Sequence, residues 1–82
     1  MKDYKIAKIT WQDAETYGDS AWIAIEEGID QASTPPPCMS SVGWVLHQDD
    51  HYVAITSDLG PNECGHITKI PLQMVRTMEI LD

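Results

Sequence analysis

Cations are missing from most of this 82-residue sequence, because no Lys or Arg occurs between Ile9 and Thr68. The same stretch carries ten acids, and the formal net charge of the chain is −8. Nucleic-acid binding relies on Lys and Arg that neutralise phosphates, so this pattern argues against a nucleic-acid partner. The acids are either a solvated surface that keeps a small protein in solution or an acidic face for a basic partner.

Long apolar runs are also missing. No segment approaches the ~20 apolar residues of a membrane helix, and Met1 is followed by polar residues instead of a signal-peptide apolar region. We therefore expect no membrane association and a location in the cytoplasm. Only two cysteines are present, Cys38 and Cys64, and we expect both to be free thiols in a reducing cytosol.

Motifs that carry catalytic or metal chemistry are absent too. Cys38, His47, His51 and the Cys64-Gly65-His66 run supply zinc-ligand types, but not at paired Cys-x-x-Cys or His-x-x-x-His spacing. There is no phosphate loop, Gly-rich fingerprint or nucleophile elbow. A Cys with a His could form a thiolate nucleophile, although most small proteins contain such a pair. We expect no metal, no cofactor and no catalytic residue.

The chain is long enough for one small core and too short for two, so residues 1–82 are predicted to form a single domain. Because there is no Phe, three Trp and three Tyr must fill the interior together with the aliphatic residues.

The first half predicts a strand and a helix. Residues 4–11 interleave β-formers with Lys, which favours a strand with one buried face. A helix from about Ser20 to Ala32 follows, with Asp19 or Ser20 as its cap. Its apolar stripe is expected to face the barrel, and its acids to point outward. The stripe consists of Trp22, Ile25 and Ile29, and the acids are Glu26, Glu27 and Asp30.

The second half predicts four more strands after the stiff connector of Pro35, Pro36 and Pro37. The clearest pair is a hairpin of residues 38–47 and 52–56, whose turn contains Asp49 and Asp50. Residues 66–70 are predicted to form a strand, and Pro71 either ends it or marks an edge position. A single helical turn over residues 72–75 and a closing strand over residues 77–81 follow. Five short antiparallel strands most economically close as a small barrel.

Trp44 is predicted to lie in the core of that barrel, because it sits mid-strand on one face with Val42 and Leu46. Gly43 beside it would permit a bulge or a close approach by another side chain, and the ring of Trp44 would then lie across the barrel. For Trp11 and Trp22 a core role is also favoured. The alternative is that Trp11, Trp22 and Trp44 line a shallow ligand groove between the helix and the barrel.

The run from Cys38 to Asp50, CMSSVGWVLHQDD, followed by Tyr52-Val53-Ala54-Ile55, resembles a family of small, mostly uncharacterised bacteriophage and prophage proteins. The resemblance continues in Trp11-Gln12-Asp13, in the Trp-bearing helix and in Ile70-Pro71. It implies an SH3-like barrel with a helix in the first long loop, made in a bacterial host by a phage or prophage. It supplies no catalytic residues.

These observations predict a non-catalytic accessory protein that binds a host or phage protein and inhibits a host process. The predicted partner-binding residues are Glu26, Glu27, Asp30, Asp49 and Asp50. The alternative function is sequestration of a small ligand, such as a nucleotide signal, in a groove or between subunits of a homo-oligomer. An anionic nucleotide would need the few cations or backbone amides of the chain for its phosphates.

Overall fold

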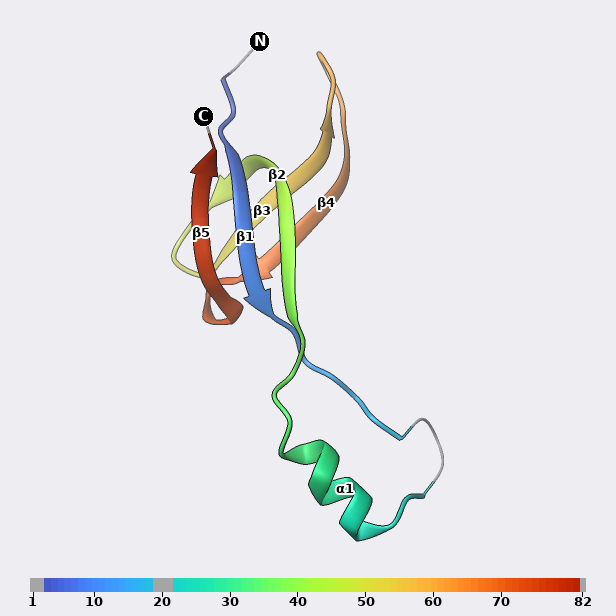
Figure 1. Ribbon diagram of the computed structural model, residues 1–82. Helices are drawn as coiled ribbons and strands as arrows, with labels where there is room; N and C mark the ends of the chain where they lie inside the picture. The colour runs from blue at the N-terminus through green and yellow to red at the C-terminus, as the bar shows by residue number, and fades with distance from the viewer. Residues whose placement is uncertain (1–2, 19–21, 82) are drawn as a thin grey trace.

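The computed structural model describes residues 3–18 and 22–81. It is mainly β, with five antiparallel strands in one sheet of order β4-β3-β2-β1-β5 and one short helix (Figure 1). The elements are β1 (Ile6–Gln12), α1 (Ile25–Ala32), β2 (Cys38–Gln48), β3 (Tyr52–Leu59), β4 (Cys64–Pro71), a 3-10 turn (Leu72–Met74) and β5 (Val75–Leu81).

The five predicted strands and the helical turn are confirmed, and most strands extend by a few residues. The connection between β3 and β4 is a tight turn, because Gly60 N donates to Glu63 O at 2.7 Å and strands continue to either side. Closure into a barrel is not observed. Within the described residues β4 and β5 pair on one side only, so the sheet is open.

The core lies on one face of the sheet. Ala7 and Ile9 of β1 have no exposed surface, whereas Lys8 between them is exposed, as the alternation of a half-buried strand requires. Val53 and Ile55 of β3 complete the cluster together with Ile70. A small set of aliphatic side chains therefore holds the sheet together, with partly buried side chains around it.

Gly43 allows β3 to approach β2 closely. A Cβ at this position would lie 2.6 Å from Thr56 O and 3.2 Å from Ile55 Cβ. Two residues later the β2–β3 register shifts between Val45 and His47, where Leu46 is bulged. A close approach is observed at Gly43, but its nearest atom is a main-chain oxygen of β3, whereas the prediction was a side chain.

The prediction that Trp44 lies in the core is wrong. Gly43 pairs with the core residue Ala7, and Val45 pairs with the core residue Ile55, so the intervening Trp44 points to the opposite face. It is partly buried there. The predicted alternation along β2 holds as far as Val45 and is broken by the bulge at Leu46, and the face chosen as the interior was the wrong one.

The helix differs from its prediction in both extent and position. It begins at Ile25, later than the predicted Ser20, and its N-cap Ala24 makes no side-chain capping bond. The predicted caps, Asp19 and Ser20, lie outside the described residues. No residue of α1 is buried, so its apolar stripe does not pack on the sheet as expected.

We call residues 13–37 the arm, because this segment projects from the end of β1 and β2 and carries α1 away from the sheet (Figure 1). The molecule is consequently elongated, with extents of 56 × 23 × 21 Å. The sheet and the arm thus form two regions of different character.

Candidate functional site

The arm is anchored where it leaves the sheet. Asp13 N donates to Pro37 O at 3.1 Å, and Gln12 Nε2 donates to Pro36 O at 3.1 Å. Arg76 of β5 in turn donates from Nε to Gln12 Oε1 at 3.0 Å. The first two of these hydrogen bonds hold the two ends of the arm together, so the arm is a loop with closely spaced ends.

The end of α1 is fixed by its own polar residues. Ser33 N donates to Ile29 O at 3.1 Å, and Ser33 Oγ donates to Asp30 O at 2.9 Å. Thr34 Oγ1 donates to Gln31 O at 2.7 Å. Three prolines follow and cannot extend the helix. The predicted stiff connector therefore leads from α1 back to the sheet.

The apolar stripe of the arm faces solvent. Trp22 is 100% exposed, Ile25 is 79% exposed and Ile29 is 64% exposed. A helix with one strongly apolar face normally buries that face. Large apolar patches that stay exposed mark interaction sites. The stripe is therefore the strongest structural indication of a binding surface in the described part of the chain.

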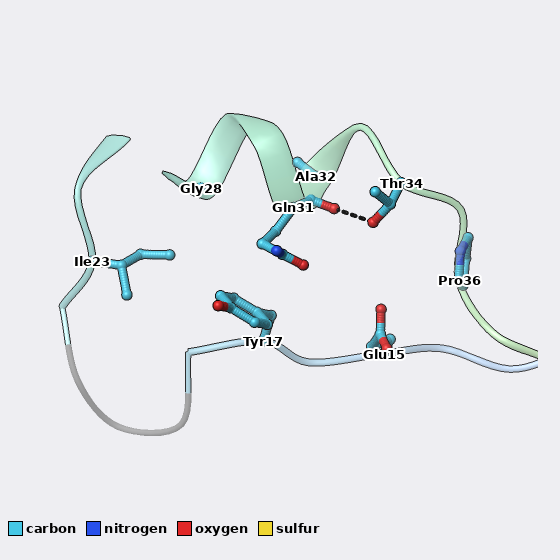
Figure 2. A pocket seen from close by; sticks show the side chains of 8 residues that line it. All are labelled: Glu15, Tyr17, Ile23, Gly28, Gln31, Ala32, Thr34 and Pro36. Atoms are coloured by element: carbon cyan, nitrogen blue, oxygen red, sulfur yellow. Dashed lines mark hydrogen bonds between the residues drawn. The ribbon is translucent and has the colours of Figure 1, made fainter. Parts of the chain in front are cut away.

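A cavity of about 380 Å³ lies between α1 and the extended chain that leads to it. Figure 2 shows the side chains of Tyr17, Ile23 and Gln31 turned toward this space, with Glu15 at its side. The size matches that of small-ligand pockets. Its charged lining group, Glu15, is an acid, which does not suit a phosphate.

The structure does not bring the predicted acidic residues together. Glu26, Glu27 and Asp30 are exposed on α1 at the far end of the arm. Asp49 and Asp50 lie at the β2–β3 turn, in the sheet. The five acids predicted to form one surface therefore lie in two separate places, on the arm and at the β2–β3 turn.

Asp49 has a structural role in its turn. Its carboxylate accepts hydrogen bonds from His51 N at 2.7 Å and Tyr52 N at 3.0 Å, and from His47 Nε2 at 2.9 Å. The bond from His47, and then the two amides, lower the pKa of Asp49 from 3.8 to about 2. The hydrogen bonds that Asp49 accepts within the turn explain why an acid stands at this position. The acids of the arm therefore remain the better candidates for contact with a partner.

The three tryptophans do not share an environment. Trp11 packs against the core, and its Nε1 donates to Ser41 Oγ at 3.0 Å. Trp22 is fully exposed on the arm. Trp44 lines a hollow beside the β3–β4 hairpin, next to Asp58 and Cys64. The predicted ligand groove, which required the helix to lie against the sheet, is therefore not formed.

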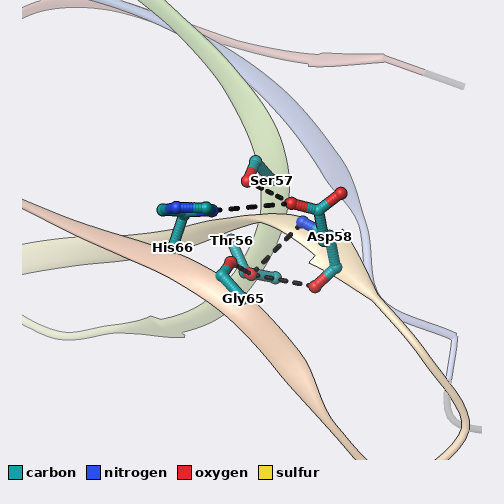
Figure 3. Close-up of polar contacts among 5 residues, drawn as sticks. All are labelled: Thr56, Ser57, Asp58, Gly65 and His66. Atoms are coloured by element: carbon teal, nitrogen blue, oxygen red, sulfur yellow. Dashed lines mark hydrogen bonds and ion pairs between the residues drawn. The ribbon is translucent and has the colours of Figure 1, made fainter.

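A Ser, an Asp and a His meet on that hairpin without the order of a catalytic triad (Figure 3). Ser57 Oγ donates to Asp58 Oδ2 at 2.8 Å, and His66 Nδ1 lies 3.8 Å from the same oxygen. Asp58 therefore lies between the other two, whereas a triad places the histidine next to the serine. The Thr56 hydroxyl beneath them has the carbonyl oxygens of Asp58 and Gly65 as acceptors for its single hydrogen. The contacts of Thr56 with Gly65 and of Asp58 with His66 connect β3 to β4.

The cysteines and histidines do not gather into a metal site. Both Cys38 and Cys64 are free and exposed, and the described residues contain no group of three His, Cys, Asp or Glu placed to hold an ion. A membrane-spanning helix is not found among the described residues either.

One surface was missed by sequence reasoning. The strand registers align five residues on the face opposite the core, one from each strand: Ile67, Thr56, Trp44, Ile6 and Leu81. We call this set the outer row. Such alignment depends on the pairing of distant strands, so it becomes visible only once the registers are known.

Comparison with protein-family models, curated proteins and solved structures gives no match. The function is therefore argued from geometry.

Proposed function

We propose that this chain is a non-catalytic accessory protein of a phage or prophage that binds a host or phage protein through its arm. The observation that carries the proposal is the exposed arm, which holds an apolar stripe next to acids and whose described residues, 13–18 and 22–37, contribute nothing to the core. Amphipathic helices commonly bind proteins by laying such a face on a complementary surface. Inhibition of a host process would follow if that surface is one the host uses.

The charge of the arm indicates a basic partner. Between Asp13 and Pro37 the sequence has six of the 13 acids and none of the five Lys and Arg residues. Glu26, Glu27 and Asp30 are exposed beside the stripe. Complementary charges speed association and select partners. We therefore assign the partner contact to these three acids.

An SH3-like architecture is part of this proposal. It is supported by the strand order, in which β5 joins β1, and by the 3-10 turn between β4 and β5. In this arrangement the sheet is a compact base, and the long β1–β2 connection is free to carry the binding element.

Sequestration of a small ligand is the second candidate, and the cavity of the arm favours it. The space lined by Tyr17, Ile23 and Gln31 is large enough for a small molecule. Because Glu15 is the charged lining group, a neutral or cationic ligand fits better than a nucleotide. Thermal shift of the protein against nucleotides and against cationic metabolites tests this candidate.

The main proposal is tested by purifying tagged protein from infected bacteria, identifying the co-purified protein and measuring its association rate. Reversal of Glu26, Glu27 and Asp30 to Lys should slow association with little change in melting temperature. Association of the wild-type protein should also slow as salt rises past about 0.15 M.

The matched control reverses three acids of the sheet region, Asp3, Glu63 and Glu79, which are all exposed. It changes the net charge equally and should leave the association rate closer to wild type. A partner whose binding ignores both salt and the reversals on the arm would contradict the proposal.

A further inference from the structure

The chain exposes more surface than a compact monomer of its size. Its accessible area is 6542 Å², whereas a folded monomer of 9.2 kDa is expected to expose ~4900 Å². The radius of gyration is 16.9 Å, against about 12 Å for a compact chain of this length. The excess of about 1600 Å² is in the range that each subunit buries in an obligate homodimer.

The sheet offers an apolar surface that matches the stripe. The outer row crosses all five strands, a width of about 19 Å, and α1 is about 12 Å long. Ile67 of this row is 54% exposed, and Val42 beside it is 55% exposed. Trp44 of the row is partly buried. Thr56, between Ile67 and Trp44 in the row, is itself fully buried. A helix laid across the strands would therefore contact the exposed residues around it, Ile67, Val42 and the exposed part of Trp44.

Charges of both signs lie next to the outer row. Lys8 is paired with Val42, and Lys69 is paired with Ala54, so both lysines lie on the outer face in the positions flanking the row. Glu79, opposite Lys8 on the edge strand β5, is an acid near that edge. The arm carries only acids. An arm approaching the sheet of another copy therefore meets two lysines together with the exposed acids Glu79 and Asp58, of which Asp58 lies beside Trp44.

We propose that the apolar stripe of the arm docks on the outer row of a second copy of this chain, so that two copies exchange arms. The same contact is made twice about a two-fold axis, as in most homodimers. The inference rests on the proposed function in treating the arm as an interaction element. The acids on the far side of α1 stay exposed in the pair and remain able to contact another partner.

The first test is the mass of the purified full chain in solution, by sedimentation or light scattering at tens of micromolar. We expect about twice 9.2 kDa. Trp22→Ser with Ile25→Ser should weaken the dimer by at least about 30-fold, as expected for loss of a buried aromatic anchor. Ile67→Lys on the outer row should do the same.

The matched control is Ile80→Lys, because Ile80 is 41% exposed but pairs with Ala7 on the core side of the sheet. It should leave the mass at that of a dimer. A monomeric wild-type protein, or a dimer that survives both the arm and the outer-row variants, would overturn the inference.

A cross-link identifies what the stripe contacts. In a Cys38→Ser, Cys64→Ser background, chains with Ile25→Cys are mixed with chains bearing Ile67→Cys and oxidised. We expect a disulfide between the two kinds of chain. Cross-linking of Ile25→Cys chains among themselves, without the mixed product, would mean that arm packs on arm and would overturn the inference.

Failure of this inference is distinguishable from failure of the proposed function. If the chain is monomeric but the reversals of the arm acids still slow association with the co-purified protein, only the exchange of arms is wrong. If the chain is a dimer that cross-links as expected but no partner depends on those acids, only the host or phage contact is wrong.

Discussion

The sheet and the arm divide the hydrophobic residues of this chain in opposite ways. In the sheet, Ile9 and Ile70 have almost no exposed surface, whereas in the arm Ile25 and Ile29 are mostly exposed. The same residue type thus supports folding in one region and is left for an intermolecular contact in the other. The lesson is that an amphipathic pattern predicts that a face will be covered but not that the same molecule covers it.

The largest expected effect separates the two regions directly. Ile9→Ala leaves a cavity in the core and should lower the free energy of unfolding by about 2–5 kcal/mol, most of the stability of so small a domain. Ile25→Ala in α1 should change it by less than about 0.5 kcal/mol in dilute solution. Chemical denaturation measures both. Equal losses would mean that the arm belongs to the folded core.

Glycine substitutions should act with opposite signs in the two regions. Gly43→Ala places a Cβ against Thr56 O and should cost roughly 1–3 kcal/mol. Gly28→Ala meets only Ile23 Cδ1 at 3.8 Å, and should stabilise α1 by about 0.5–1 kcal/mol. Denaturation of Gly43→Ala and helix content of Gly28→Ala by circular dichroism provide the readouts. A tolerated Gly43→Ala would disprove the close approach of β3.

The turn of the sheet should respond to acid through Asp49. Because its pKa is lowered to about 2, its charge stabilises the fold above the unfolded value near 3.8, and this contribution disappears as the pH falls toward 2. Asp49→Asn keeps an oxygen for the backbone amides but loses the charge. The difference in melting temperature between wild type and Asp49→Asn should be largest above about pH 4 and shrink toward pH 2. A difference that does not vary with pH would contradict this role.

The smallest effect is expected at the thiols. Cys38 and Cys64 are both exposed, so a thiol reagent should titrate two groups in the native, reduced protein. Replacing either by Ser should change stability by less than about 0.5 kcal/mol. Stoichiometric zinc, or a single reactive thiol, would contradict the assignment.

The strands could be predicted from sequence because their signals are local. Alternation around Ile9 and the turn residues Asp49 and Pro71 mark the ends and the faces of strands within a few positions. Alternation separates two sets of side chains but does not say which set is inside. That choice depends on Gly43, whose missing side chain lets β3 approach the core face of β2, so Trp44 was placed on the wrong side.

The position of the helix and the candidate site could be predicted only in part. The acids of α1 were identified, and they are exposed. Their separation from Asp49 and Asp50 was not predictable, because it depends on the direction of the arm. The stripe of Trp22, Ile25 and Ile29 was predicted to pack on the sheet of the same chain, because an apolar face is normally covered. It is exposed instead.

Excision of the arm tests the central claim, that the sheet folds by itself and the arm serves interaction. The bond from Asp13 N to Pro37 O brings the ends of β1 and β2 together, so residues 14–36 can be replaced by an Asn-Gly turn. We predict a monomer that unfolds cooperatively near the melting temperature of dilute wild-type protein and binds no partner. A chain without the arm that is unfolded, or that still dimerises and binds the partner, would contradict the account.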